Sequence, residues 1–60
     1  MGRMEIFCIV LEGLQKYNLD DLNEYDEAVK CTEFLMKRSD VLTIAEIDKF
    51  LFNRYEDYLY

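Results

Sequence analysis

Apolar residues recur every three or four positions through most of this chain, a spacing typical of helices with one buried face. The polar side chains of the first such segment share one sector of roughly 100° on a helical projection; they are Glu5, Glu12, Gln15 and Lys16. We therefore predict a helix over residues 4–17. The alternative is a buried strand over residues 4–11, whose Ile, Phe, Cys and Val residues suit a sheet. Such a strand would find no partner within the chain, so the helix is favoured.

A second helix is predicted over residues 22–38. Asp21 and Glu24 are spaced as a pair that caps the first turn of a helix. At the other end, Lys37 and Arg38 fall where the helix dipole favours cations. The apolar stripe of this helix joins Tyr25, Ala28, Val29, Thr32, Leu35 and Met36.

A third helix is predicted over residues 44–58. Thr43 and Glu46 match the capping box, in which each side chain bonds the backbone N–H of the other residue. The stripe that this helix would bury consists of Ile44, Ile47, Leu51, Tyr55 and Tyr58. We therefore expect a single all-α domain over residues 1–60, with three helices and short connectors. Residues 1–3 are either the native N-terminus or a leader left from expression.

The chain carries much apolar surface for its size. A domain of 60 residues hides only about 60% of the surface that its unfolded chain exposes, yet 52% of the residues are apolar and 15% are aromatic. All three predicted helices carry apolar residues beyond the arc that one neighbour can cover. We therefore expect the chain to pack as a homo-oligomer and against another protein. The predicted protein interface comprises Phe7, Ile9, Leu11, Phe34, Phe50, Phe52 and Tyr55.

Acidic residues outnumber basic ones by 13 to 7, which gives a formal net charge of −6. The densest acidic patch consists of Asp20, Asp21, Glu24, Asp26 and Glu27. Acidic residues are ordinary in the first turn of a helix, and this patch also offers a surface to a basic partner. It does not match a calcium loop counted from Asp21, because Tyr25 and Asp26 stand where an oxygen ligand and a glycine are needed. We therefore expect no metal site.

Residue types suited to catalysis are scarce. The chain has no histidine, which is the commonest acid–base residue near neutral pH. Neither Cys8 nor Cys31 has an obvious basic partner in the sequence to activate its thiol, and Gly13 stands alone rather than in a phosphate-binding loop. We expect no enzyme activity and no cofactor. The cysteines fit best as small apolar residues of a reduced protein, with a disulfide within the chain or between subunits as the alternative.

These observations favour a small acidic helical protein-interaction module. We expect it to self-associate and to act as a regulator, adaptor or inhibitor by binding a partner protein. The alternative is a nucleic-acid-binding regulator of the helix–turn–helix or ribbon–helix–helix type. An acidic chain repels phosphates, and the third helix sets Lys49 and Arg54 against four acidic residues. Nucleic acid is therefore the less favoured partner.

The longest apolar run of the chain, from Ile6 to Leu11, bears on its location. It is far shorter than the ~20 residues that a membrane-spanning helix needs, and no secretory signal is recognisable. We therefore expect no membrane partner and a cytoplasmic location.

Overall fold

The computed structural model describes residues 2–38 and 42–59, and regular structure in this part of the chain is entirely helical. Three α-helices follow one another, with a short 3₁₀ helix, η1, after the third. Their bounds are Arg3–Leu14 for α1, Glu24–Arg38 for α2, Ile44–Tyr55 for α3 and Glu56–Tyr58 for η1. The all-α prediction is confirmed, and the alternative strand over residues 4–11 is wrong because those residues lie within α1.

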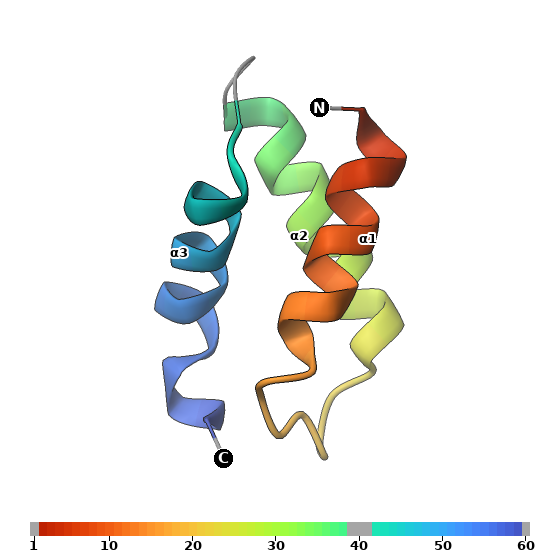
Figure 1. Cartoon of the computed structure of the whole chain (residues 1–60). Helices are drawn as coiled ribbons and strands as arrows, with labels where there is room; N and C mark the ends of the chain where they lie inside the picture. The colour runs from red at the N-terminus through yellow and green to blue at the C-terminus, as the bar shows by residue number, and fades with distance from the viewer. Residues whose placement is uncertain (1, 39–41, 60) are drawn as a thin grey trace.

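The helices form an elongated bundle in which α1 packs against both other helices. Helices α1 and α3 run in the same direction, α2 runs in the opposite direction, and the two ends of the chain lie at opposite ends of the bundle (Figure 1). The bundle measures 31 × 19 × 16 Å along its principal axes. The backbones of α2 and α3 approach one another much less than either approaches α1. Side chains must therefore bridge the space between α2 and α3.

Polar caps set the start of two helices. The Thr43 half of the predicted capping box is confirmed, because the Thr43 side chain accepts a hydrogen bond of 3.2 Å from the Glu46 backbone N–H. The Glu46 side chain accepts from the Thr43 hydroxyl at 3.3 Å instead of from the Thr43 backbone. The predicted Asp21 cap is wrong. Asn23 occupies that role, since its Oδ1 accepts from the Asp26 backbone N–H at 3.0 Å. Helix α2 therefore begins two residues later than predicted, and residues 19–22 form a separate turn with a 2.9 Å backbone hydrogen bond.

The first and third helices are shorter than predicted because their last turns tighten. After Leu14, the backbone N–H groups bond carbonyls three residues earlier, and Tyr17 then makes an isolated β-bridge with Leu59. The Asn18 backbone N–H also donates to the Tyr58 carbonyl at 2.6 Å. These contacts hold the end of the chain, including η1, against the connector between α1 and α2.

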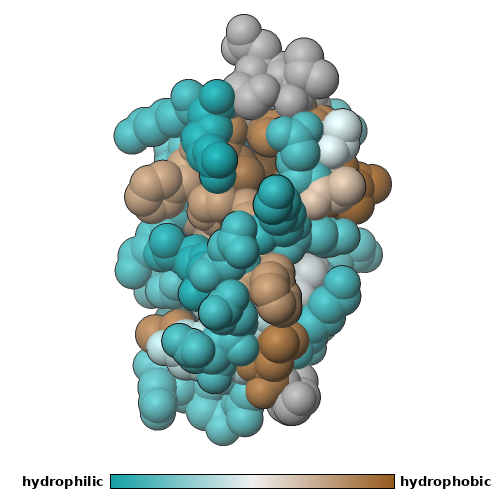
Figure 2. Space-filling view, turned by 90° about the vertical axis from the view of Figure 1, so that its left-hand side faces the viewer, coloured by the Kyte–Doolittle hydropathy of each residue, from teal (hydrophilic) through white to brown (hydrophobic). Residues whose placement is uncertain are grey.

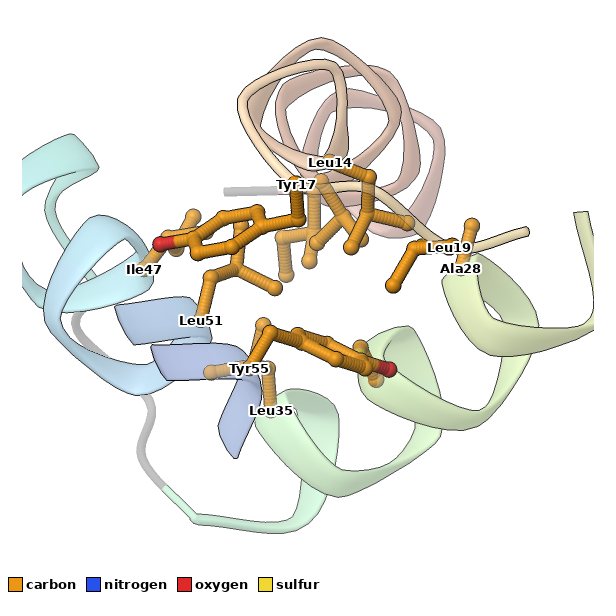
Figure 3. Packing of buried hydrophobic residues seen from close by; sticks show 11 residues of the cluster. Leu14, Tyr17, Leu19, Ala28, Leu35, Ile47, Leu51 and Tyr55 are labelled. Carbon is orange, nitrogen blue, oxygen red and sulfur yellow. The ribbon is translucent and has the colours of Figure 1, made fainter. Parts of the chain in front are cut away.

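One cluster of buried side chains holds the bundle together. Side chains from all three helices and from the α1–α2 connector converge in it (Figure 3). Its members are Ile6, Val10, Leu14, Tyr17, Leu19, Ala28, Cys31, Leu35, Ile47, Leu51 and Tyr55. The predicted stripes therefore supply most of the core, but four of their members are exposed instead of buried: Tyr25, Met36, Ile44 and Tyr58.

Gly13 lies where α1 packs closely against Leu51 of α3. A Cβ atom at this position would lie 2.5 Å from Leu51 Cδ1, which is well inside van der Waals contact. Because Leu51 is itself buried in the core, its side chain has little room to move away. The absence of a side chain at Gly13 lets the two helices pack this closely.

We expect Gly13→Ala to lower the free energy of unfolding by about 1–2 kcal/mol. Overpacking costs about 1–3 kcal/mol, and the better helix propensity of alanine returns only about 0.5–1 kcal/mol. Urea unfolding followed by circular dichroism measures the change. The control repeats the substitution in a Leu51→Ala background, where the added methyl group has space and should stabilise. An equal loss in both backgrounds would contradict this account of Gly13.

Candidate protein-interaction surface

A network of polar side chains centred on Glu27 bridges α2 and α3. The Tyr55 hydroxyl reaches from α3 toward α2 (Figure 3) and donates to Glu27 Oε1 at 2.6 Å. Cys31 Sγ lies 3.3 Å from the same hydroxyl. Arg54 Nε donates to the Tyr55 hydroxyl at 3.0 Å, and Arg54 Nη2 lies 3.7 Å from Glu27 Oε1. On the other side, Lys30 Nζ lies 3.5 Å from Glu27 Oε2.

Two sequence-based assignments are corrected by this network. Glu27 was assigned to a partner-facing acidic patch, but only 7% of its surface is exposed. Tyr55 was assigned to a protein interface, but only 2% of its surface is exposed. Each of the two residues satisfies the other's buried polar group, and a buried carboxylate needs such partners. Both residues therefore act inside the bundle.

The network shifts the pKa of Glu27, Tyr55 and Cys31. The hydrogen bond from Tyr55 is the main cause that lowers the pKa of the Glu27 carboxyl, against an opposing effect of burial. Burial is the main cause that raises the pKa of the Tyr55 phenol and that of the Cys31 thiol. The Cys31 thiol thus stays protonated at neutral pH, and a protonated thiol is a poor nucleophile. The chemistry of this cluster is that of a structural support.

Beside this network, two arginines stack on two phenylalanines, and each arginine stacks on the ring of the other helix. The Phe34 and Phe50 rings, from α2 and α3, lie 6.4 Å apart between centroids. The Arg38 guanidinium of α2 lies 5.8 Å from the Phe50 ring of α3, and the Arg54 guanidinium of α3 lies 5.6 Å from the Phe34 ring of α2. Each arginine therefore contacts the ring of the opposite helix, and such contacts are favourable.

A pocket of about 350 Å³ opens beside this stack, between the C-terminal part of α2 and one side of α3. Its lining residues are Leu35, Arg38, Leu42, Glu46, Lys49, Phe50 and Asn53. Apolar side chains and two cations thus line it together with one carboxylate. We call Phe34, Arg38, Lys49, Phe50 and Arg54, together with this pocket, the basic aromatic face.

The predicted interface residues do not form one surface. Phe34 and Phe50 come together on the basic aromatic face. Phe7, Ile9 and Leu11 lie on α1, partly buried against the core, and Phe7 meets Tyr25 of α2 edge-on at 5.4 Å. The side of the molecule that α3 occupies is mainly hydrophilic, and its apolar side chains lie in separate patches (Figure 2).

The contribution of Arg38 and Lys49 to this face was missed in the sequence. A usable signal was present, because Phe34 and Arg38, like Phe50 and Arg54, are spaced by four residues. That spacing places a ring and a cation on the same side of a helix. The exchange of partners between the helices depends on how α2 and α3 lie side by side, and no local pattern encodes that.

The remaining acidic residues of the predicted patch lie together near the start of α2. We call Asp20, Asp21, Glu24 and Asp26 the acidic end. Asp20 and Asp21 belong to the connector, whereas Glu24 and Asp26 lie in the first turn of α2. Glu24 accepts a 2.6 Å hydrogen bond from the Gln15 side chain. Within residues 2–38 and 42–59, none of the four carboxylates forms an ion pair.

The described residues contain no group of three or more side chains suited to holding a metal ion. None of their helices is long and apolar enough to cross a membrane. Both cysteines are free thiols, Cys8 exposed and Cys31 buried.

Comparison with protein families, with curated proteins and with solved structures gives no match. The function must therefore be inferred from the side chains of this chain alone. Two surfaces stand out among them: the basic aromatic face and the acidic end.

We expect Tyr55→Phe to lower the free energy of unfolding by about 1–3 kcal/mol, because the buried Glu27 carboxylate loses its closest donor. Urea unfolding at neutral pH measures the loss. The matched control is Tyr25→Phe, which removes a hydroxyl from a ring that is 63% exposed and should change stability by less than about 0.5 kcal/mol. Equal effects of the two substitutions would show that the hydroxyl of Tyr55 has no special role.

The lowered pKa of Glu27 also predicts how stability depends on pH. A carboxyl whose pKa is lower in the folded state than in the unfolded state stabilises the fold at pH values above its ordinary pKa, which is 4.5 for Glu27. That stabilisation is lost as the pH falls through the folded-state pKa. We therefore expect the stability difference between the native chain and Glu27→Gln to shrink between about pH 6 and pH 3. Urea titrations across this range measure it, and a difference independent of pH would refute the linkage.

Proposed function

We propose that this chain is a protein-interaction module that binds a partner protein through the basic aromatic face. The observation that carries the proposal is the exchanged stack of Phe34, Phe50, Arg38 and Arg54 beside a pocket. Aromatic residues and arginine are enriched among the residues that dominate binding energy in protein interfaces. Phe34 offers such a group to a partner, since 52% of its surface is exposed.

The stack favours binding because it orders its side chains before a partner arrives. Immobilising a flexible side chain in an interface costs about 0.5–1.5 kcal/mol. Arg54 is already held by Tyr55 at 3.0 Å and lies over the Phe34 ring. Arg38 is similarly placed over Phe50. A partner that docks here therefore loses less free energy to ordering than it would at a face of free side chains.

A protein is favoured over a nucleic acid as the partner. Nucleic-acid binding draws most of its affinity from cations that reach phosphates, and the chain as a whole carries a net charge of −6. On α3, Arg54 is engaged by Tyr55 and Glu27, and Glu46 lines the pocket beside Lys49. A regulator, adaptor or inhibitor is the role that we assign to a small module of this kind. We place it in the cytoplasm, where free thiols are the norm.

The test compares two substitutions of similarly exposed phenylalanines. The immobilised chain is used to capture proteins from an extract of its source, and the bound fraction is quantified by mass spectrometry. We expect Phe34→Ser to reduce capture of a specific protein at least about tenfold, which is about 1.4 kcal/mol of binding free energy. Phe52→Ser should retain it, because Phe52 is 47% exposed but takes no part in the stack.

Nuclease treatment of the extract completes the experiment. A captured protein that survives nuclease and depends on Phe34 supports the proposal. Capture that both variants retain equally would overturn it. Recovery of a nucleic acid instead of a protein would favour the nucleic-acid-binding alternative.

A further inference from the structure

The acidic end and the basic aromatic face complement one another in charge and in chemistry. We propose that the acidic end of a second copy of this chain docks in the pocket of the basic aromatic face. The inference rests on the proposed function, because it makes the same pocket the site of self-association. It also supplies a mode of regulation, since a docked copy and a partner protein would compete for one site.

The acidic end has the features of a ligand for this pocket. Tyr25 projects from the first turn of α2 with 63% of its surface exposed. Glu24 and Asp26 flank it in sequence, and Asp21 lies four residues before it. Asp21 and Asp26 are exposed and form no ion pair with a described residue. An aromatic ring between carboxylates is therefore available for contact. Tyrosine is a common anchor residue in protein interfaces.

The pocket offers the matching groups. Leu35, Leu42 and Phe50 provide apolar surface for a ring, and Arg38 and Lys49 provide cations for the carboxylates beside it. Glu46 also lines the pocket, so the cations of the lining outnumber its carboxylates by two to one. Charge-assisted hydrogen bonds of this type are stronger than neutral ones. A second copy thus satisfies both the apolar and the charged parts of the pocket.

The fold prevents one copy from filling its own pocket. The acidic end lies by the first turn of α2, and the pocket lies by the C-terminal part of α2 and one side of α3. The first and last turns of α2 lie at opposite ends of the bundle (Figure 1). The 15 residues of α2 separate the two by about 22 Å of helix. The contact must therefore form between copies. Because it joins two different surfaces, it is heterologous and leaves one pocket and one acidic end open in each assembly.

The net charge does not prevent this contact at physiological salt. Repulsion between two chains of charge −6 acts over long distances, but charges are screened beyond about 8 Å at that ionic strength. The molecule is 31 Å long, so most like charges in a head-to-tail pair lie beyond that range. Opposite charges in contact across the pocket lie well within it.

The test uses two variants that each disable one half of the contact. Lys49→Glu reverses a charge in the pocket, and Asp21→Lys with Asp26→Lys reverses the acidic end. Sedimentation velocity of the native chain should give a weight-average mass that rises with concentration above 7.3 kDa. Each variant alone should remain a monomer. An equimolar mixture should associate again, because one variant supplies an intact acidic end and the other an intact pocket.

Control variants keep the same net charges but change them elsewhere. Lys16→Glu matches the pocket variant, and Glu12→Lys with Asp57→Lys matches the acidic-end variant. Both controls should assemble as the native chain does, with circular dichroism reporting unchanged helix content in all variants. Assembly should be lost in about 1 M salt, where the Debye length is about 3 Å.

A native chain that stays monomeric at millimolar concentration would overturn the inference. So would variants that assemble alone, a mixture that does not associate, or assembly that survives high salt. The proposed function is judged separately, because capture that depends on Phe34 is measured with the immobilised chain at low concentration. Loss of self-association with retained capture would refute only this inference.

Discussion

The buried carboxylate of Glu27 is the interaction on which the placement of α2 and α3 depends. These helices make little direct backbone contact with one another, so the side chains between them set their spacing. Tyr55 reaches across from α3 with a 2.6 Å hydrogen bond, and Arg54 and Lys30 balance the charge. Removing one partner of a buried charge destabilises the fold strongly, because the remaining charge is left buried without compensation. The pair of helices is therefore held in one arrangement by a polar contact within an otherwise apolar core.

This inner network also determines what the surface can do. The hydrogen bond from Arg54 to Tyr55 holds the Arg54 guanidinium against the Phe34 ring. The neighbouring Arg38 completes the stack on Phe50. Much of the excess negative charge is left at the far end of the bundle, beside the start of α2. An acidic chain thereby presents a locally basic and aromatic surface. The distribution of charge over the surface, as well as the net charge, therefore bears on the partners of such a molecule.

Local sequence patterns predicted the helices well, because the stripes and the Thr43 cap depend on residues close together in the chain. They failed where two residues could cap the same helix, since Asn23 and not Asp21 caps the start of α2. They also failed for Glu27, which was expected at the surface, and they placed Tyr55 both in the buried stripe and at an interface. Both residues are buried because each meets the other across 28 residues of sequence. Of the candidate site, Phe34 and Phe50 were predicted individually. Their pairing, and the pocket beside them, follow from tertiary packing that the sequence pattern does not contain.

The two cysteines of the native chain can report how often α2 and α3 separate. Cys8 is exposed on α1, whereas Cys31 is buried against the Tyr55 hydroxyl between α2 and α3. A thiol reagent would label Cys8 directly but would reach Cys31 only when the two helices separate. The ratio of the two labelling rates therefore measures the free energy of that local separation in the unmodified chain. A ligand that binds across α2 and α3 would slow the second rate while leaving the first unchanged.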